Sequence, residues 1–104
     1  MLTETIVDRF NREIRFTRER WDYIVSKRPI MSEYKNQFID TIKEPELIKT
    51  SVYDPEVVLY YKHFKNILGG KYMVTVIKMN TDRFVLTGYI SDRIKEGDVI
   101  WRKD

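Results

Sequence analysis

Hydrophobic and polar residues alternate most clearly in the second half of the chain, in three segments rich in β-branched and aromatic residues. The segments are 56–64 (EVVLYYKHF), 71–80 (KYMVTVIKMN) and 83–93 (RFVLTGYISDR). Such a composition suits the pleated, half-buried surface of a sheet. Turn-forming residues at 66–70 and 80–82 separate the segments. The pattern therefore predicts three consecutive strands in an antiparallel meander.

Apolar residues recur at helical spacing in two segments that precede these strands. Thr17 is the expected N-cap of a helix over 17–28, and Ser32 is the expected N-cap of a helix over 32–43. A proline follows each segment closely, as is typical after the end of a helix. We therefore expect two helices ahead of the meander.

The first residues of the chain give a weaker pattern. Residues 4–8 and 13–16 are candidates for short strands joined by a turn near Asn11. Both helices need an apolar surface, which one face of the sheet provides. We therefore expect a single α+β domain over residues 1–104, with two N-terminal helices packed on one face of a four-stranded, mainly antiparallel sheet.

Side-chain alternation predicts which residues lie on the face of the sheet that the helices leave open. Residues two apart on a strand share a face, so Thr87 and Tyr89 lie together in the last strand. We assign these two side chains to the open face. The opposite face of the strand is then expected to lie beneath the helices, with Phe84, Leu86 and Ile90 buried.

The two preceding strands are assigned to the same open face from their polar residues. In the first strand of the meander, Tyr60 and Lys62 share a face, and we place it with the open face. The second strand is compatible with either orientation. Because Lys78 is charged, we place it on the open face together with Tyr72, Val74 and Val76, which alternate with it. The open face would then present phenols, a hydroxyl and ammonium groups, which is the one constellation in the chain that suggests chemistry.

Composition excludes several classes of function. The chain has 104 residues, 42% of them hydrophobic, and no cysteine, which removes disulfides, thiolate zinc sites and cysteine nucleophiles. The sole histidine, His63, lies on the side of its strand assigned to the core or its edge, so we expect a structural role. The carboxylates show no metal-ligand spacing. We therefore expect no metal site and no cofactor.

No apolar run approaches the length of a membrane span, and the first residues lack the pattern of a signal peptide. We expect a cytoplasmic protein without a membrane partner. The net charge of +3 is mild, but cations outnumber carboxylates between residues 12 and 28. Such a bias is compatible with a solvated surface or with phosphate binding. RNA is therefore a candidate partner.

A series of short motifs follows in order along residues 14–101. They are Arg20-Trp21-x-x-Ile24, Arg28-Pro29, Thr41-Ile42-x-x-Pro45-x-Leu47-Ile48, Tyr60-Tyr61-Lys62, Val74-x-Val76-x-Lys78, Phe84-Val85-x-Thr87-x-Tyr89, Asp92-Arg93-Ile94-Lys95-x-Gly97 and Trp101. The series resembles the phage-type nucleases of the barnase–EndoU–colicin–RelE (BECR) superfold. The resemblance implies a RelE- or barnase-like domain, of phage or toxin origin, with a helical pair ahead of a four-stranded antiparallel sheet and an active surface on the open face.

The resemblance further implies metal-independent cleavage of RNA through attack of the ribose 2′-hydroxyl, which leaves a cyclic phosphate. The catalytic candidates are Arg28 and Lys62 for holding the phosphate, Thr87 for a hydrogen bond to it, and Tyr89, with Tyr60 as an alternative, for proton transfer. The substrate-binding candidates on and beside the open face are Tyr60, Lys78, Ser91 and Arg93. RNA and an antitoxin or immunity protein are the partners that this hypothesis implies.

One departure from the family bears on activity. Sequences of this family usually carry His-Pro where this chain has Arg28-Pro29. Arginine stays protonated, so it binds phosphate but does not act as a general base. Three hypotheses follow: a nuclease, weakened or with a different base; a non-catalytic RNA-binding or protein-interaction module on the same fold; and a structural phage accessory domain.

Overall fold

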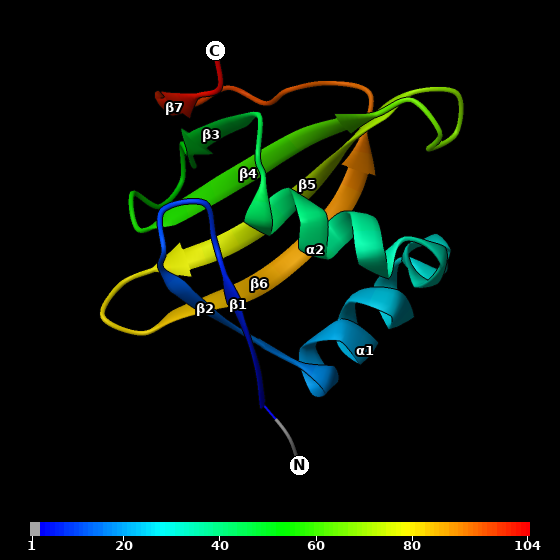
Figure 1. Ribbon diagram of the computed structural model, residues 1–104, viewed down its shortest axis with the longest axis horizontal. Coiled ribbons are helices and arrows are strands. Elements are labelled where there is room, and N and C mark those ends of the chain that lie inside the picture. Colours follow the sequence, from blue (N-terminus) through cyan, green and yellow to red (C-terminus); the bar gives the residue numbers. More distant parts are fainter. Residues whose placement is uncertain (1–2) are drawn as a thin grey trace.

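The computed structural model describes residues 3–104 (Figure 1). Met1 and Leu2 lie outside the described residues, and they are part of the segment in which no signal peptide is expected. The elements follow in the order β1 (Thr3–Val7), β2 (Glu13–Thr17), α1 (Arg18–Lys27), the 3₁₀ helix η1 (Pro29–Glu33), α2 (Lys35–Lys43), β3 (Leu47–Thr50), β4 (Val57–Phe64), β5 (Lys71–Met79), β6 (Arg83–Ser91) and β7 (Val99–Arg102). None of the helices in residues 3–104 is long and apolar enough to cross a membrane.

All strands of the described chain join one mixed sheet in the order β1-β2-β6-β5-β4-β3-β7. The predicted meander β4-β5-β6 is confirmed, with antiparallel pairing throughout. The predicted four-stranded sheet is wrong, because the sheet has seven strands. The β1–β2 hairpin extends one edge through a parallel contact of β2 with β6, and β3 and β7 extend the other edge. β3 and β7 have only four residues each, too few for a clear alternation pattern.

The two predicted helices are present, with one error at a cap. The backbone N–H of Arg20 donates to Thr17 Oγ1 at 3.0 Å, so Thr17 caps α1 as predicted. The prediction for Ser32 is wrong, because this residue lies inside η1. α2 begins after Tyr34 without a side-chain cap. Its stability therefore depends on the apolar side that it packs against the sheet.

The helices bury one face of the sheet, here called the helix face, and form the main core. Phe38 of α2 packs against Phe16 of β2 and Trp21 of α1, with ring centroids 5.2 and 5.3 Å away. Beneath Phe38 lies Gly88 of β6, where an added Cβ would stand 2.1 Å from the phenyl ring. Glycine at this position therefore lets α2 approach the sheet closely.

A β-bulge changes the predicted orientation of β6. Val76 pairs with Thr87, but Ile77 pairs with Val85, so Leu86 is an extra residue between the two pairs. Val85 is therefore buried on the helix face in place of Phe84 and Leu86, which are only half-buried. The prediction of a buried Phe84 and Leu86 is wrong because strict alternation does not continue through a bulge. Ile90, beyond the bulge, lies on the helix face as predicted and packs against its core, but it is half-buried instead of buried.

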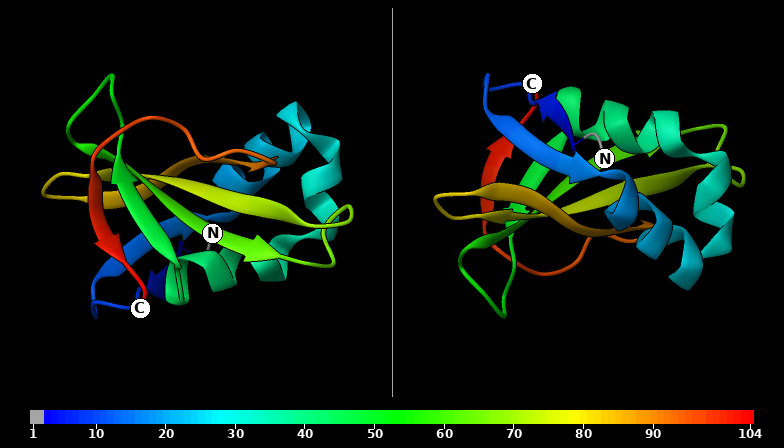
Figure 2. Two further views of the ribbon diagram at one scale, coloured as in Figure 1. Left: turned by 90° about the horizontal axis from the view of Figure 1, so that it is seen from above. Right: turned by 90° about the horizontal axis from the view of Figure 1, so that it is seen from below.

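The opposite face of the sheet is partly covered by residues 92–98, here called the strap. Figure 2 shows the strap and α2 on opposite sides of the sheet, so we call this side the strap face. A small second core of Leu59, Tyr61 and Val74 lies there. At Gly97, φ is +145° and an added Cβ would lie 2.1 Å from the carbonyl oxygen of Thr50. Glycine therefore lets the strap close against β3.

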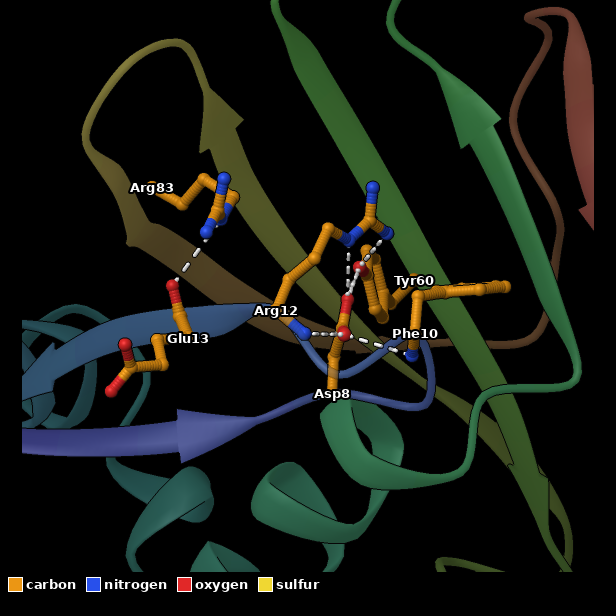
Figure 3. A network of polar contacts seen from close by, with 6 residues as sticks. All are labelled: Asp8, Phe10, Arg12, Glu13, Tyr60 and Arg83. Atoms are coloured by element: carbon orange, nitrogen blue, oxygen red, sulfur yellow. Dashed lines mark hydrogen bonds and ion pairs between the residues drawn. The ribbon is translucent and has the colours of Figure 1, made fainter.

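The turn between β1 and β2 is tied to the middle of the sheet by a polar network on the helix-face side (Figure 3). Tyr60 of β4 is fully buried, and its hydroxyl donates to Asp8 Oδ2 at 2.5 Å. The Arg12 guanidinium donates to both members of this pair, to Asp8 Oδ2 at 3.0 Å and to the Tyr60 hydroxyl oxygen at 2.8 Å. The turn also contacts the far edge of the sheet, since Phe10 packs edge-on against Trp101 of β7 at 5.3 Å. The sheet is curled enough for its two edges to meet through this turn.

Candidate phosphate-binding groove

Two adjoining hollows on the strap face bring together part of the predicted site. The first hollow, of about 540 Å³, is lined by Arg28, Thr87 and Tyr89, and by Lys95 and Glu96 of the strap. The three predicted catalytic residues in this set come from the end of α1 and from β6. The structure therefore places them around one cavity.

The second hollow lies beside α1 and has a volume of about 690 Å³. Arg20, Tyr23 and Lys27 of α1 line it, together with Arg28 and Thr87. Arg28 and Thr87 line both hollows, so the two hollows adjoin, and we call the pair the groove. The groove runs from the side of α1 across β6 to the strap.

Local structure explains why Arg28 faces the groove rather than the core. Arg28 is the C-cap of α1, and its backbone N–H donates to the carbonyl oxygen of Ile24 at 2.9 Å. Pro29 follows immediately, so the helix ends there and the chain turns into η1. The side chain of Arg28 is exposed, and its guanidinium carbon lies 5.5 Å from the centre of the Tyr89 ring.

The cations of the groove have no carboxylate partner in the part of the chain that the structure describes. Among these residues Arg20, Lys27, Arg28 and Lys95 form no ion pair. Arg20 instead donates to the carbonyl oxygen of Leu86 at 3.2 Å. Unpaired cations lining one depression favour an anionic ligand, above all one with several phosphates.

Tyr89 lines the first hollow, and two of these cations lie close to its ring. Lys95 Nζ lies 4.8 Å from the centre of the Tyr89 ring, and the Arg28 guanidinium carbon lies 5.5 Å from it. Both distances are typical of cation–π contacts. The Tyr89 hydroxyl is buried and has no hydrogen-bond partner among residues 3–104. Burial raises the pKa of Tyr89, although the neighbouring Tyr61 hydroxyl and, to a smaller extent, the charge of Arg28 oppose the change. At neutral pH the phenol is therefore protonated and able to donate a hydrogen bond.

The strap is held over this floor by defined contacts. The backbone N–H of Lys95 donates to the Tyr61 hydroxyl at 3.1 Å, and Lys49 Nζ donates to the Lys95 carbonyl at 2.6 Å. Burial raises the pKa of Tyr61, so its hydroxyl stays neutral as an acceptor. These two hydrogen bonds fix the backbone of Lys95 and so keep its side chain close to Tyr89.

Lys62, a predicted catalytic residue, does not belong to the groove. It lies on the helix face, where its Nζ donates to Asp40 Oδ2 of α2 at 2.7 Å. Its predicted companion Tyr60 lies on the same face and is fully buried. The placement of both beside Thr87 and Tyr89 is wrong, because β4 is apolar on both faces between Val57 and Tyr61 and alternation alone could not orient it.

The remaining substrate-binding candidates have structural contacts. Lys78 is on the strap face as predicted, but its Nζ pairs with Asp54 at 2.8 Å and with Glu56 at 3.3 Å. Ser91 Oγ accepts the backbone N–H of Arg93 at 3.0 Å and donates to its carbonyl oxygen at 2.9 Å. Lys78 therefore braces the loop before β4, and Ser91 shapes the start of the strap. Arg93 is exposed and lies outside both hollows.

Among the lining residues of the first hollow that the sequence did not predict are an aromatic and two charged ones, namely Tyr53, Lys95 and Glu96. All three are in irregular segments, where strand alternation and helical periodicity give no orientation. The strap enters the sequence analysis only as the motif Asp92-Arg93-Ile94-Lys95-x-Gly97, with Arg93 as its candidate residue. The one available signal was Tyr53, an aromatic residue in a turn-forming segment between strands.

His63 is exposed on the strap face, where its ring packs edge-on against Tyr72 at 5.1 Å. The prediction that it lies in the core or at its edge followed from the wrong orientation of β4. Within residues 3–104, no three His, Asp or Glu side chains gather into a potential metal site. The expectation of metal independence stays a prediction for assay in EDTA.

Comparison with known proteins gives no relative: no family model, no curated protein and no solved structure matches the chain. The function is therefore inferred from the groove alone.

Proposed function

We propose that the protein binds RNA along the groove on the strap face. The observation that carries the proposal is the set of four cations without carboxylate partners among the described residues, Arg20, Lys27, Arg28 and Lys95. They line two hollows that share Arg28 and Thr87. A phosphate at the shared position would accept hydrogen bonds from the guanidinium and the hydroxyl, and neighbouring phosphates would meet the cations on either side.

Binding should be measured by fluorescence anisotropy with a labelled RNA oligonucleotide over a range of salt concentrations. Arg28→Gln should weaken binding and lower the slope of log affinity against log salt by about 0.7, the value for one phosphate contact on a single strand. Lys62→Gln is the matched control, because Lys62 is a cation of the same sheet that faces Asp40 instead of the groove. Equal effects of the two substitutions, or no binding by the parent, would contradict the proposal.

A second candidate function is metal-independent cleavage of the bound RNA. Glu96 lines the same hollow as Arg28 and the protonated Tyr89, and it supplies the carboxylate base that Arg28 cannot. Glu96 would accept the proton of the ribose 2′-hydroxyl while the 2′-oxygen attacks phosphorus. Arg28 and Lys95 would stabilise the extra negative charge. Tyr89 would donate a proton to the 5′-oxygen as the P–O5′ bond breaks, leaving a cyclic phosphate. The antitoxin or immunity protein implied for such a nuclease would then have to cover this groove.

Cleavage is tested with a defined RNA oligonucleotide in EDTA, with mapping of the product ends. Glu96→Gln and Tyr89→Phe should each lower the rate by about 10²–10⁴-fold, the usual cost of losing a general base or acid. Arg28→His removes the guanidinium that stabilises the phosphate, so it should lower the rate if Glu96 is the base. A higher rate would instead assign the role of base to a histidine at this position. Lys62→Ala should leave the rate unchanged. Equal rates for all variants would indicate a contaminating nuclease, and binding without cleavage would leave RNA binding as the function.

A further inference from the structure

The two hollows of the groove differ in chemistry, and this difference bears on the kind of RNA that the proposed function would accept. The hollow beside α1 is lined mostly by cations and by Tyr23. The hollow under the strap has instead an apolar floor and wall, formed by Val57, Leu59 and Val76 together with Val52 and Tyr53. A phosphate chain alone has no use for such a floor, because apolar surface attracts another apolar surface.

Tyr53 is the most exposed aromatic residue among the described side chains, with 94% of its surface accessible. It lines the same hollow as Arg28 and Lys95. A large aromatic side chain that no other residue covers is a ready stacking platform for a planar ring. Its position beside cations favours a ring that is attached to phosphate.

The loop that carries Tyr53 is held in place by its neighbours. The backbone N–H of Tyr53 donates to Ser51 Oγ at 3.1 Å, and that of Glu56 donates to Asp54 Oδ1 at 2.9 Å. Lys78 of β5 pairs with Asp54 from below at 2.8 Å. These contacts reduce the conformational freedom that the loop would lose when a ligand binds.

We infer that the hollow under the strap is a nucleobase subsite for single-stranded RNA. One unpaired base lies on the floor of Val57, Leu59 and Val76 and stacks against Tyr53. Its phosphate is held at Arg28, and the chain continues toward Lys27 and Arg20. This inference deepens the proposed RNA binding and depends on it. A base in a duplex is stacked and paired, so it does not enter the hollow without leaving the helix.

The test compares ligands with the same number of phosphates and different bases. Anisotropy titrations use labelled oligouridine and oligoadenosine, an abasic oligomer of the same length, and a duplex. The parent should bind the single strands roughly 5- to 150-fold more tightly than the abasic oligomer, the range expected for one base stacked on an aromatic ring. Tyr53→Ala should remove this preference and leave the affinity for the abasic oligomer unchanged.

Three further variants make the result specific. Tyr53→Phe keeps the aromatic ring and should retain the preference for bases. Ile100→Ala removes an exposed apolar side chain on β7, outside both hollows, and should change nothing. Tyr23→Ala removes the aromatic residue of the other hollow, so any loss of affinity should be the same for all oligomers, the abasic one included, and the ratio between them should not change.

The outcomes separate this inference from the function on which it depends. If all oligomers, abasic ones included, bind equally and in an Arg28-dependent manner, the base subsite is overturned while RNA binding along the groove stands. If Tyr23→Ala instead of Tyr53→Ala removes the preference, the base lies in the other hollow and the inference is overturned. If no oligomer binds, both proposals fail together.

Discussion

The two faces of the sheet differ in how their cations are paired. On the helix face, Lys62 Nζ lies 2.7 Å from Asp40 Oδ2. On the strap face, Arg28 and Lys95 lie over the ring of Tyr89 and have no carboxylate partner in the described chain. The first arrangement is typical of a cation that supports packing, since its charge is already matched inside the protein. The second leaves positive charge to be matched from outside. The comparison teaches that a cation beside the sheet supports packing where a carboxylate faces it, and remains available to a ligand where none does.

The largest difference expected between the faces is in stability. Phe38→Ala removes a fully buried ring between both helices and the sheet, so it should lower the free energy of unfolding by about 3–5 kcal/mol. Val76→Ala on the strap face removes less apolar surface from a half-buried site, and about 1 kcal/mol or less is expected. Urea denaturation with analysis of the midpoint and slope measures both. Equal losses would mean that the strap face contributes as much core as the helix face.

A second prediction concerns the polar network of the helix-face side. Tyr60→Phe deletes the hydroxyl that donates to the buried carboxylate of Asp8, so stability at neutral pH should fall by about 1.5–3 kcal/mol. Tyr53→Phe is the control, because that hydroxyl is fully exposed and its loss should cost nothing measurable. Equal stability of the parent and Tyr60→Phe would show that the network is not a net source of stability.

The same network predicts a dependence on pH. Burial, with Asp8 nearby, raises the pKa of Tyr60 above its ordinary value of 10. The native state therefore holds this proton more tightly than the unfolded chain does, so the contribution is complete below pH 10 and is lost as the pH rises above 10. Denaturation series across this range should show a smaller decline for Tyr60→Phe than for the parent. Parallel curves would contradict the assignment to Tyr60.

A substitution at Gly97 tests whether the position of the strap affects both stability and RNA binding. An alanine there would combine a positive φ with a contact between Cβ and the Thr50 carbonyl, and a loss of about 1–3 kcal/mol is expected. Because the strap carries Lys95, RNA affinity should fall as well. Gly69→Ala is the matched control: φ is +80° but no atom lies within 4 Å of the added Cβ, so stability should fall slightly and RNA binding should not change. Unaltered RNA affinity of Gly97→Ala would separate the strap from the proposed site.

The smallest expected effects distinguish the two kinds of cation directly. Lys62→Met should lower stability by about 1 kcal/mol or less, since the pair with Asp40 is only partly buried. Arg28→Met should change stability by no more than about 0.5 kcal/mol, as for most surface substitutions. Thermal and urea denaturation of both variants are sufficient. A larger loss for Arg28→Met would assign this residue to packing and weaken the case for a ligand.

The sequence predicted the elements better than the way they assemble. The meander and both helices follow from local periodicity and from Thr17 as a cap, which are properties of neighbouring residues. The parallel pairing of β2 with β6 was not predictable in this way, because it joins Arg15 to Phe84 across most of the chain. The bulge at Leu86 likewise depends on the partner strand and has no local signal in the sequence.

The candidate site was predictable only where a regular element carries it. Thr87 and Tyr89 share a face because they are two residues apart on β6, and Arg28 was found through the motif that ends α1. Lys62 was misplaced because β4 buries apolar side chains on both faces, which removes the contrast that alternation needs. Lys95 was missed because it reaches the groove on a segment without regular structure.

The parallel contact between β2 and β6 also has a consequence for the order in which the protein is made and folds. The β1–β2 hairpin leaves the ribosome first, yet its buried residues Ile14 and Phe16 have no sheet to join until β6 follows. The contact of Phe10 with Trp101 is available later still. Because pairings of such separation delay folding, the apolar side of this hairpin is covered at first only by α1 and α2, which supply Trp21 and Phe38 to Phe16, and its place in the sheet is fixed once β6 has been translated.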